Sequence, residues 1–150
     1  MAAISFTIPG APFAKQRPRA TRQGRVYTPA ATVSFERQVG QIALQHFREP
    51  IAGPVRLEVA AFFAPAPSWS KRKRVGHLGM PHCQRPDADN LVKAIWDGLN
   101  RIAFADDAQI AECVVRKRWA EVPQTIVTVA PLDAWRSIGD LAREAVEATR

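Results

Sequence analysis

The stretch RPDADNLVKAIWDGLNRI, residues 85–102, places two aspartates directly before an apolar run with helical spacing. Apolar side chains from Leu91 to Ile102 recur at intervals of three or four residues, which is the period of a helix. They cover most of its circumference, so this helix is predicted to be largely buried in the core. The rest of its surface is a narrow polar stripe that consists of Asp89, Lys93, Asp97 and Asn100.

The segments on either side of this helix predict a small α/β (α+β) fold. We expect strands over residues 4–8, 54–65, 110–121 and 124–132. We expect further helices over about 32–48 and 133–149, and loops over 10–31 and 66–86. The last two strands are predicted to form a hairpin around Val122-Pro123. The order β-α-β-α-β-β-α indicates a mixed sheet of about four strands with helices packed mainly on one face.

Length and composition favour one soluble domain. A chain of 150 residues is long enough for a single core, here expected over about residues 4–131 of a domain spanning 1–150. No apolar run is long enough to cross a membrane, and the start MAAISFTIPG lacks the pattern of a signal peptide, which predicts a cytoplasmic protein. Cys83 and Cys113 lie too far apart for the usual zinc spacing and are expected to be reduced thiols.

The basic residues are concentrated in two intervals without acids, and the net charge is +7. The first precedes Glu36 and contains Lys15, Arg17, Arg19, Arg22 and Arg25. The second lies between Glu58 and Asp87 and contains Lys71, Arg72, Lys73, Arg74 and Arg85. A single run of this kind is compatible with a solvated loop. Two runs that flank an acidic cluster favour contacts with a nucleic acid backbone.

Five of the seven aspartates fall within 21 residues, namely Asp87, Asp89, Asp97, Asp106 and Asp107. Each has an ordinary structural interpretation as a helix cap, a surface ion pair or a turn residue. A helix needs only one capping aspartate, however, and the chain could bring Asp106 or Asp107 back toward the first pair. Carboxylates about 4 Å apart repel by about 4 kcal/mol at an effective dielectric constant near 20. A divalent cation would offset this repulsion, and Mg²⁺ or Mn²⁺ suits such oxygen ligands.

A carboxylate-bound metal in a basic surround suggests cleavage of a phosphodiester. Such a metal activates water and stabilises charge on the reacting phosphate. Lys93 projects from the same helix face and is a candidate for stabilising that charge or positioning the water.

The segment RPDADNLVKAIWDGLNRIAFADDAQI, residues 85–110, resembles the core motif of the RusA family of Holliday junction resolvases, which are common in prophages. FTIPGAPFAKQRPR and VVRKRWA are also similar to the family, so the resemblance spans roughly residues 4 to 130. It implies metal-binding carboxylates at Asp87, Asp89 and Asp107, with a secondary role for Asp106, and a catalytic lysine at Lys93. It also implies Mg²⁺ dependence, a homodimer, and paired cuts in a four-way junction.

The sequence thus predicts a magnesium-dependent, structure-selective endodeoxyribonuclease of recombination and repair. The KRKR run and the segment after Pro131 exceed the shortest members of the family and bear on substrate preference. Two alternatives are a nuclease of the same chemistry that acts on flaps or single strands, and a non-catalytic DNA-binding protein with structural aspartates.

Overall fold

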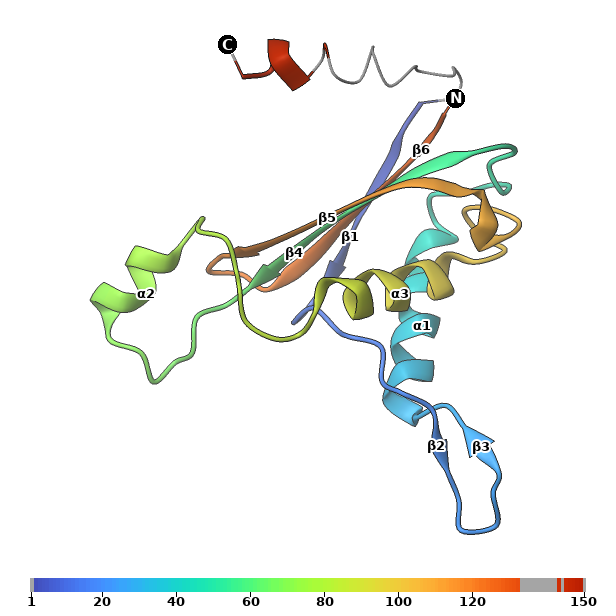
Figure 1. Cartoon of the computed structure of the whole chain (residues 1–150), viewed down its shortest axis with the longest axis horizontal. Coiled ribbons are helices and arrows are strands. Elements are labelled where there is room, and N and C mark those ends of the chain that lie inside the picture. The colour runs from blue at the N-terminus through green and yellow to red at the C-terminus, as the bar shows by residue number, and fades with distance from the viewer. Residues whose placement is uncertain (1, 133–142, 144, 150) are drawn as a thin grey trace.

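The computed structural model describes residues 2–132, 143 and 145–149. Four strands form a mixed sheet in the order β1-β6-β4-β5 (Figure 1). Their bounds are β1 Ile4–Pro9, β4 Val55–Phe63, β5 Ile110–Trp119 and β6 Gln124–Pro131. Strand β6 runs antiparallel to both of its neighbours, whereas β4 and β5 are parallel. The predicted mixed sheet of about four strands is therefore confirmed.

Two helices, α1 (Ala30–Ala43) and α3 (Ala88–Leu99), cover one face of the sheet (Figure 1). The alternating side chains of β4 and β6 that point to this face, such as Leu57 and Val127, are fully buried. The two helices approach each other closely at Gly98, where an added Cβ would lie 2.7 Å from Cβ of Val39. The opposite face carries an ion-pair network of Arg56, Glu58, Glu112 and Arg116, with N to O distances from 2.7 to 3.4 Å. The prediction that the helices pack mainly on one face of the sheet is thus confirmed.

The hairpin predicted around Val122-Pro123 is wrong, because β5 and β6 are not neighbours. Strand β4 lies between them and pairs with both. The connection crosses the end of β4, where the amide of Ala120 donates a hydrogen bond of 2.9 Å to the carbonyl of Phe63. A short connection is equally compatible with a hairpin and with this crossing, so its length does not identify the neighbouring strand.

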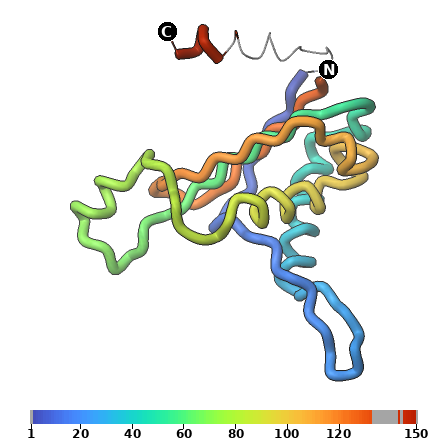
Figure 2. Tube along the Cα trace, viewed as in Figure 1, coloured from blue at the N-terminus to red at the C-terminus, as the bar shows by residue number. Residues whose placement is uncertain are grey.

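Both predicted loops contain regular structure. Residues 71–77 form α2 (Lys71–His77), whose N-cap Ser70 accepts a hydrogen bond of 3.2 Å from the amide of Lys73. Strands β2 (Arg19–Ala20) and β3 (Val26–Tyr27) form a small antiparallel pair, with Gly24 in the left-handed conformation of the turn. Residues 17–28, here called the basic arm, extend away from the sheet, as do residues 66–80, here called the α2 lobe (Figure 2).

Aromatic contacts attach the α2 lobe to the end of the sheet. The rings of Trp69 and Trp119 lie 5.2 Å apart, and His77 meets Trp119 edge-on. No helix in the described ranges is long and apolar enough to cross a membrane. The helix predicted over 133–149 falls mostly outside the described residues, although 143 and 145–147 are helical.

Candidate active site

The segment that leads into the acidic pair is attached to the edge strand β5. The amide of Gly79 donates to the carbonyl of Trp119 at 2.8 Å, and the amide of Trp119 donates to the carbonyl of Met80 at 3.0 Å. The amide of His82 donates to the carbonyl of Lys117 at 2.9 Å. Backbone hydrogen bonds therefore fix the path of the chain shortly before Asp87.

Lys117 continues this attachment with its side chain. Its ammonium donates hydrogen bonds of 2.6 Å to the carbonyls of Gln84 and of Pro86. The acceptors are backbone atoms more than thirty residues away, and no spacing in the sequence shows such a contact. Lys117 is a site residue that sequence reasoning missed, although it lies within the VVRKRWA segment that resembles the family.

Asp87 and Asp89 lie at the start of α3, where α3 meets the segment attached to β5. Asp87 occupies the N-cap position, yet its side chain accepts no capping hydrogen bond. Asp89 lies in the first turn, and both side chains are exposed. Among the residues that the structure describes, neither carboxylate takes part in a hydrogen bond or an ion pair. Helix capping therefore does not account for this pair of acids.

An open hollow of about 380 Å³ adjoins Asp87. It is lined by Arg85, Pro86, Asp87 and Asn90. A cation and a carboxylate thus line one concave surface at the start of α3, and helix N-termini attract anionic groups such as phosphates. The predicted DNA contact at Arg85 lies within this surface.

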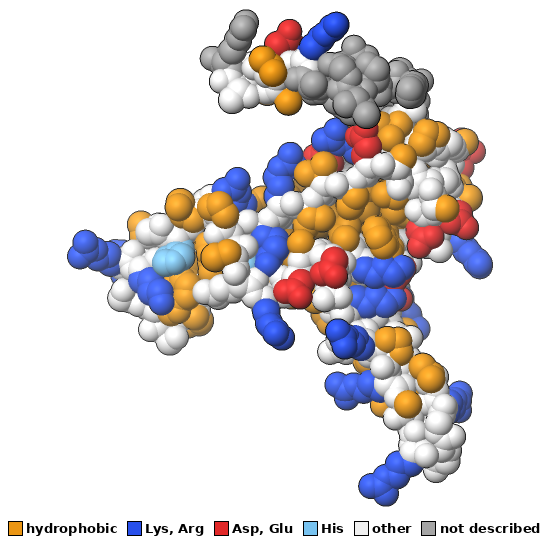
Figure 3. All heavy atoms as spheres, viewed as in Figure 1, with side chains coloured by type: hydrophobic (Ala, Val, Ile, Leu, Met, Phe, Trp, Pro, Cys, Tyr) orange, Lys and Arg blue, Asp and Glu red, His pale blue; other side chains and the backbone are white. Residues whose placement is uncertain are grey.

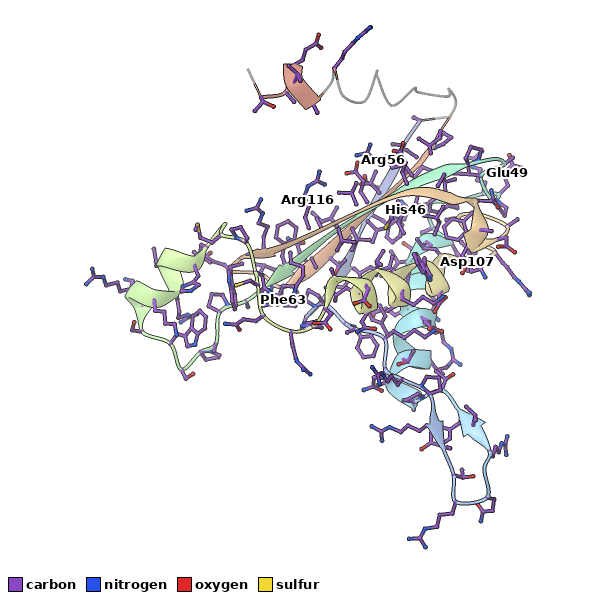
Figure 4. All side chains as sticks on the ribbon, in the orientation of Figure 1. His46, Glu49, Arg56, Phe63, Asp107 and Arg116 are labelled. Atoms are coloured by element: carbon purple, nitrogen blue, oxygen red, sulfur yellow. The ribbon has the colours of Figure 1, made fainter. Side chains whose placement is uncertain are left out.

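Lys93, one turn into α3, connects two further acids. Its Nζ donates a hydrogen bond of 2.7 Å to Oδ1 of Asp97 and lies 3.7 Å from Oδ2 of Asp107. The ammonium also lies 5.0 Å from the centre of the Trp96 ring. Figure 4 labels Asp107 where the chain comes back past α3 on its way to β5. The predicted return of the chain therefore does bring Asp107 to the face of Lys93.

The two acids of the pair Asp106-Asp107 have different surroundings. Asp106 caps the short 3-10 helix η1 (Asp107–Gln109), and its Oδ1 accepts a hydrogen bond of 2.8 Å from the amide of Ala108. Gln109 accepts from the amide of Asp106 and donates to the carbonyls of Ile51 and Gly53 at 2.8 and 2.7 Å. These bonds fix the turn and direct Asp107, rather than Asp106, toward Lys93.

Asp97 is the most enclosed acid of the site, with 18% of its side chain exposed. It forms ion pairs with Lys93 and with Lys15, and Lys15 also contacts Glu36 on α1 at 3.2 Å. Burial alone would raise the pKa of Asp97, but the hydrogen bonds and charges of the two lysines outweigh it and lower that pKa. Burial likewise opposes the charged form of Lys15, yet its two acidic partners raise its pKa. Both groups therefore remain ionised at neutral pH.

The structure brings only some of the predicted site residues together. Lys93 and Asp107 meet, but within the described ranges no three His, Cys, Asp or Glu side chains gather closely enough to hold a metal ion. Of the predicted DNA contacts, Lys15 is engaged in ion pairs. The others are exposed, and comprise Arg17, Arg19, Arg22 and Arg25 in the basic arm, Lys71, Arg72, Lys73 and Arg74 in α2, and Arg85. Figure 3 shows acidic side chains near the middle of this face, with basic side chains on the projections to either side.

Comparison with known proteins identifies the class of this site. A family model described as Endodeoxyribonuclease RusA matches residues 9–130, which include the basic arm, the α2 lobe and α3. The match places the chain among enzymes that cut within DNA strands. The chain belongs to the RusA family, as its motifs indicated. It is also 34% identical over 142 residues to the "Uncharacterized protein YqaN" of Bacillus subtilis (strain 168), which covers 89% of this chain and all of that protein.

Proposed function

We propose that this chain is a magnesium-dependent, structure-selective endodeoxyribonuclease that resolves four-way DNA junctions by paired cuts during recombination and repair. One observation carries the proposal. Two carboxylates that have no partner in the described part of the chain, Asp87 and Asp89, lie at the start of the helix whose next turn presents Lys93 to Asp107. This arrangement lies between two basic projections in a chain of the RusA family.

Asp87, Asp89 and Asp107 are the residues that would hold Mg²⁺, with Mn²⁺ as a possible substitute. The donor type suits such an ion, because carboxylate oxygens are its preferred protein ligands and the first two carboxylates have no competing partner among the described residues. The three carboxylates do not gather closely enough in the described ranges to hold the ion as they stand, so binding would require their side chains to move together. When bound, the metal supplies an activated water and neutralises charge on the phosphate. Asp106 has a secondary role, since its side chain already caps η1.

The remaining groups of the site hold and orient the phosphodiester. Arg85 and the N-terminus of α3 attract a phosphate into the hollow beside Asp87. Lys93 places a positive charge on the same helix, one turn further on, where it stabilises negative charge that develops during cleavage. Lys117 keeps the segment before Asp87 in position through the carbonyls of Gln84 and Pro86.

The two basic projections would bind flanking DNA through its phosphates. Within residues 2–132, 143 and 145–149, the exposed arginines of the basic arm and the basic residues of α2 form no ion pair that competes for their charge. Lys73 alone among them has a charge contact there, because its ammonium lies 3.9 Å from the centre of the Trp69 ring. Phosphate contacts hold DNA without reading its sequence. We further propose a homodimer, because a two-fold symmetric enzyme presents two equivalent sites to a junction with two-fold symmetry.

Asp89→Asn tests this proposal because it removes one ligand charge with little change in size. We expect cleavage of a four-way junction in Mg²⁺ to fall by about a hundredfold or more, a loss typical of removing a catalytic electrostatic group. Junction binding should be retained or strengthened, since a charge that repels phosphate is gone. Glu49→Gln, an exposed acid remote in sequence from the motif, serves as the control and should cut normally.

The same assay separates the alternatives. Equal rates of the wild-type protein on a four-way junction, a flap and a linear duplex would indicate a nuclease without junction selectivity. Normal cleavage by Asp89→Asn would rule out the proposed metal site. Tight binding without any cut by the wild-type protein in Mg²⁺ or Mn²⁺ would indicate a non-catalytic DNA-binding protein.

A further inference from the structure

The geometry points to Asp97 as the positioning residue of Lys93, and to Lys15 as the residue that holds Asp97 in place. We infer that Lys15 serves this function and does not bind DNA phosphate, although it begins the basic interval of the N-terminal region. This inference rests on the proposed function, in which Lys93 stabilises charge during cleavage. It adds functions for Asp97 and Lys15, which the proposed function does not explain.

The contacts of Lys93 show which acid fixes its position. Asp97 lies at hydrogen-bond distance, 2.7 Å, whereas Asp107 lies at 3.7 Å, which is an ion pair without a hydrogen bond. A lysine side chain has several freely rotating bonds. The side chain of Lys93 is 41% exposed, so its ammonium would sample many positions without this hydrogen bond. The hydrogen bond to Asp97 restricts it to the face of α3 that carries Asp89.

Asp97 divides its two carboxylate oxygens between two lysines. Oδ1 accepts from Lys93, and Oδ2 accepts from Lys15. With each oxygen bound to a different ammonium, the carboxylate cannot rotate without breaking one of the bonds. Lys15 therefore determines the orientation in which Asp97 meets Lys93.

Lys15 is itself fixed from three sides. Its ammonium contacts Asp97 on α3 and Glu36 on α1, and its backbone amide donates a hydrogen bond of 2.9 Å to the carbonyl of Asn90. Its side chain is only 27% exposed, unlike the exposed arginines of the basic arm. Binding a phosphate would draw Lys15 away from two carboxylates and leave Asp97 and Glu36, two like charges, without it. These contacts favour a positioning role over a phosphate contact.

Single-turnover cleavage of a four-way junction at saturating protein, together with the affinity for the junction, tests the inference. We expect Asp97→Asn and Lys15→Met each to slow cleavage by about ten- to a hundredfold, the scale of losing a hydrogen bond between charged groups. The affinity and its salt dependence should stay within about twofold for both variants. Asp97→Glu restores the charge and should recover part of the rate. Arg37→Met, which removes an exposed charge from α1, is the control and should match the wild type.

A phosphate-binding lysine would give a different result. Arg22→Met, in the exposed turn of the basic arm, should weaken binding and flatten its salt dependence. If Lys15→Met behaves in the same way, or if Asp97→Asn cuts at the wild-type rate, the inference is wrong. Reductive methylation read by mass spectrometry gives a second measure that needs no cleavage. Lys93 should be methylated faster in Asp97→Asn than in the wild type, and an unchanged rate would contradict the contact.

The outcomes also separate this inference from the proposed function. A wild-type protein that does not cut would refute the proposed function itself. If the wild type cuts, Lys93→Met is inactive, and the variants at Asp97 and Lys15 cut normally, then the proposed function holds and only the positioning roles fail. Thermal unfolding of each variant excludes a loss of activity through unfolding.

Discussion

Gly98→Ala provides a quantitative test of the contact between α1 and α3. A Cβ at this position would lie 2.7 and 2.9 Å from Cβ and Cγ1 of Val39, and 3.0 Å from the carbonyl oxygen of Glu36. Val39 is fully buried, and the oxygen belongs to the backbone of α1, so neither can turn aside. The two helices must therefore separate or tilt to admit the methyl group.

Two opposing effects set the size of the change. Overpacking a core costs about 1–3 kcal/mol, and the rigid contacts place this site toward the upper end. Alanine favours a helix over glycine by about 1 kcal/mol. We therefore expect the free energy of unfolding to fall by about 2 kcal/mol. In a domain of this size, that corresponds to a melting temperature lower by about 4–8 °C.

Urea and thermal unfolding measure this difference, with Gly76→Ala in α2 as the matched control. Nothing lies within 4 Å of a Cβ built at Gly76, so only the helix propensity changes and stability should stay equal or rise. Gly98→Ala should also slow junction cleavage, because Glu36 and Asp97 adjoin the contact that moves. A Gly98→Ala protein as stable as the wild type, or as stable as Gly76→Ala, would refute this account of the helix packing.

Three further changes test the site. Lys117→Met removes the ammonium that binds the carbonyls of Gln84 and Pro86. Single-turnover cleavage by this variant should fall at least tenfold, with the melting temperature nearly unchanged. Cleavage at the wild-type rate would show that these hydrogen bonds are dispensable. The pKa of Asp97 is lower in the folded protein than in an unfolded chain, where an aspartate has a pKa of about 4. Its ion pairs therefore stabilise the fold fully above about pH 4, and this stabilisation is lost as the pH falls through the lowered pKa of the folded state. The difference in unfolding free energy between wild type and Asp97→Asn should thus be constant from about pH 7 to pH 5 and shrink below about pH 4, and a difference that grows on acidification would contradict the lowered pKa. A third variant replaces the basic residues of α2, Lys71, Arg72, Lys73 and Arg74, with alanine. Fluorescence anisotropy should show weaker junction binding, and the slope of log affinity against log salt should fall by about 0.9 for each phosphate that the variant no longer binds. An unchanged slope would mean that these four residues are only solvated.

The strands and the two long helices could be predicted because their periodicity reflects local burial. The alternation in residues 54–65 marks the side chains that β4 buries, and the spacing from Leu91 to Ile102 marks the buried side of α3. The order of strands could not be predicted in the same way. The choice between pairing β5 with β6 and inserting β4 between them depends on contacts between distant segments, and neither strand's own pattern contains that information.

In the candidate site, too, local sequence patterns could be recognised, but contacts between distant segments could not. The clustered aspartates and Lys93 were visible in the sequence, and the return of Asp107 toward Lys93 follows the predicted doubling back of the chain. The contacts of Lys15 and Lys117 could not be predicted, because the sequence shows the charge of a basic residue but not its partner. Lys15 binds two carboxylates and Lys117 binds two carbonyls, and these contacts are the basis for proposing positioning roles for both lysines.

The position of β6 in the sheet has a consequence for how the chain folds. The first strand pairs only with β6 among the described strands, with Ile4 opposite Val129. During synthesis β1 must therefore wait until nearly the whole core has emerged, and β4 also lacks one neighbour until then. Sheets built from such distant pairs form slowly, in milliseconds to seconds, and expose unpaired edges meanwhile. A chain truncated before Gln124 should fail to fold and should aggregate, even though every proposed catalytic residue is already present in it.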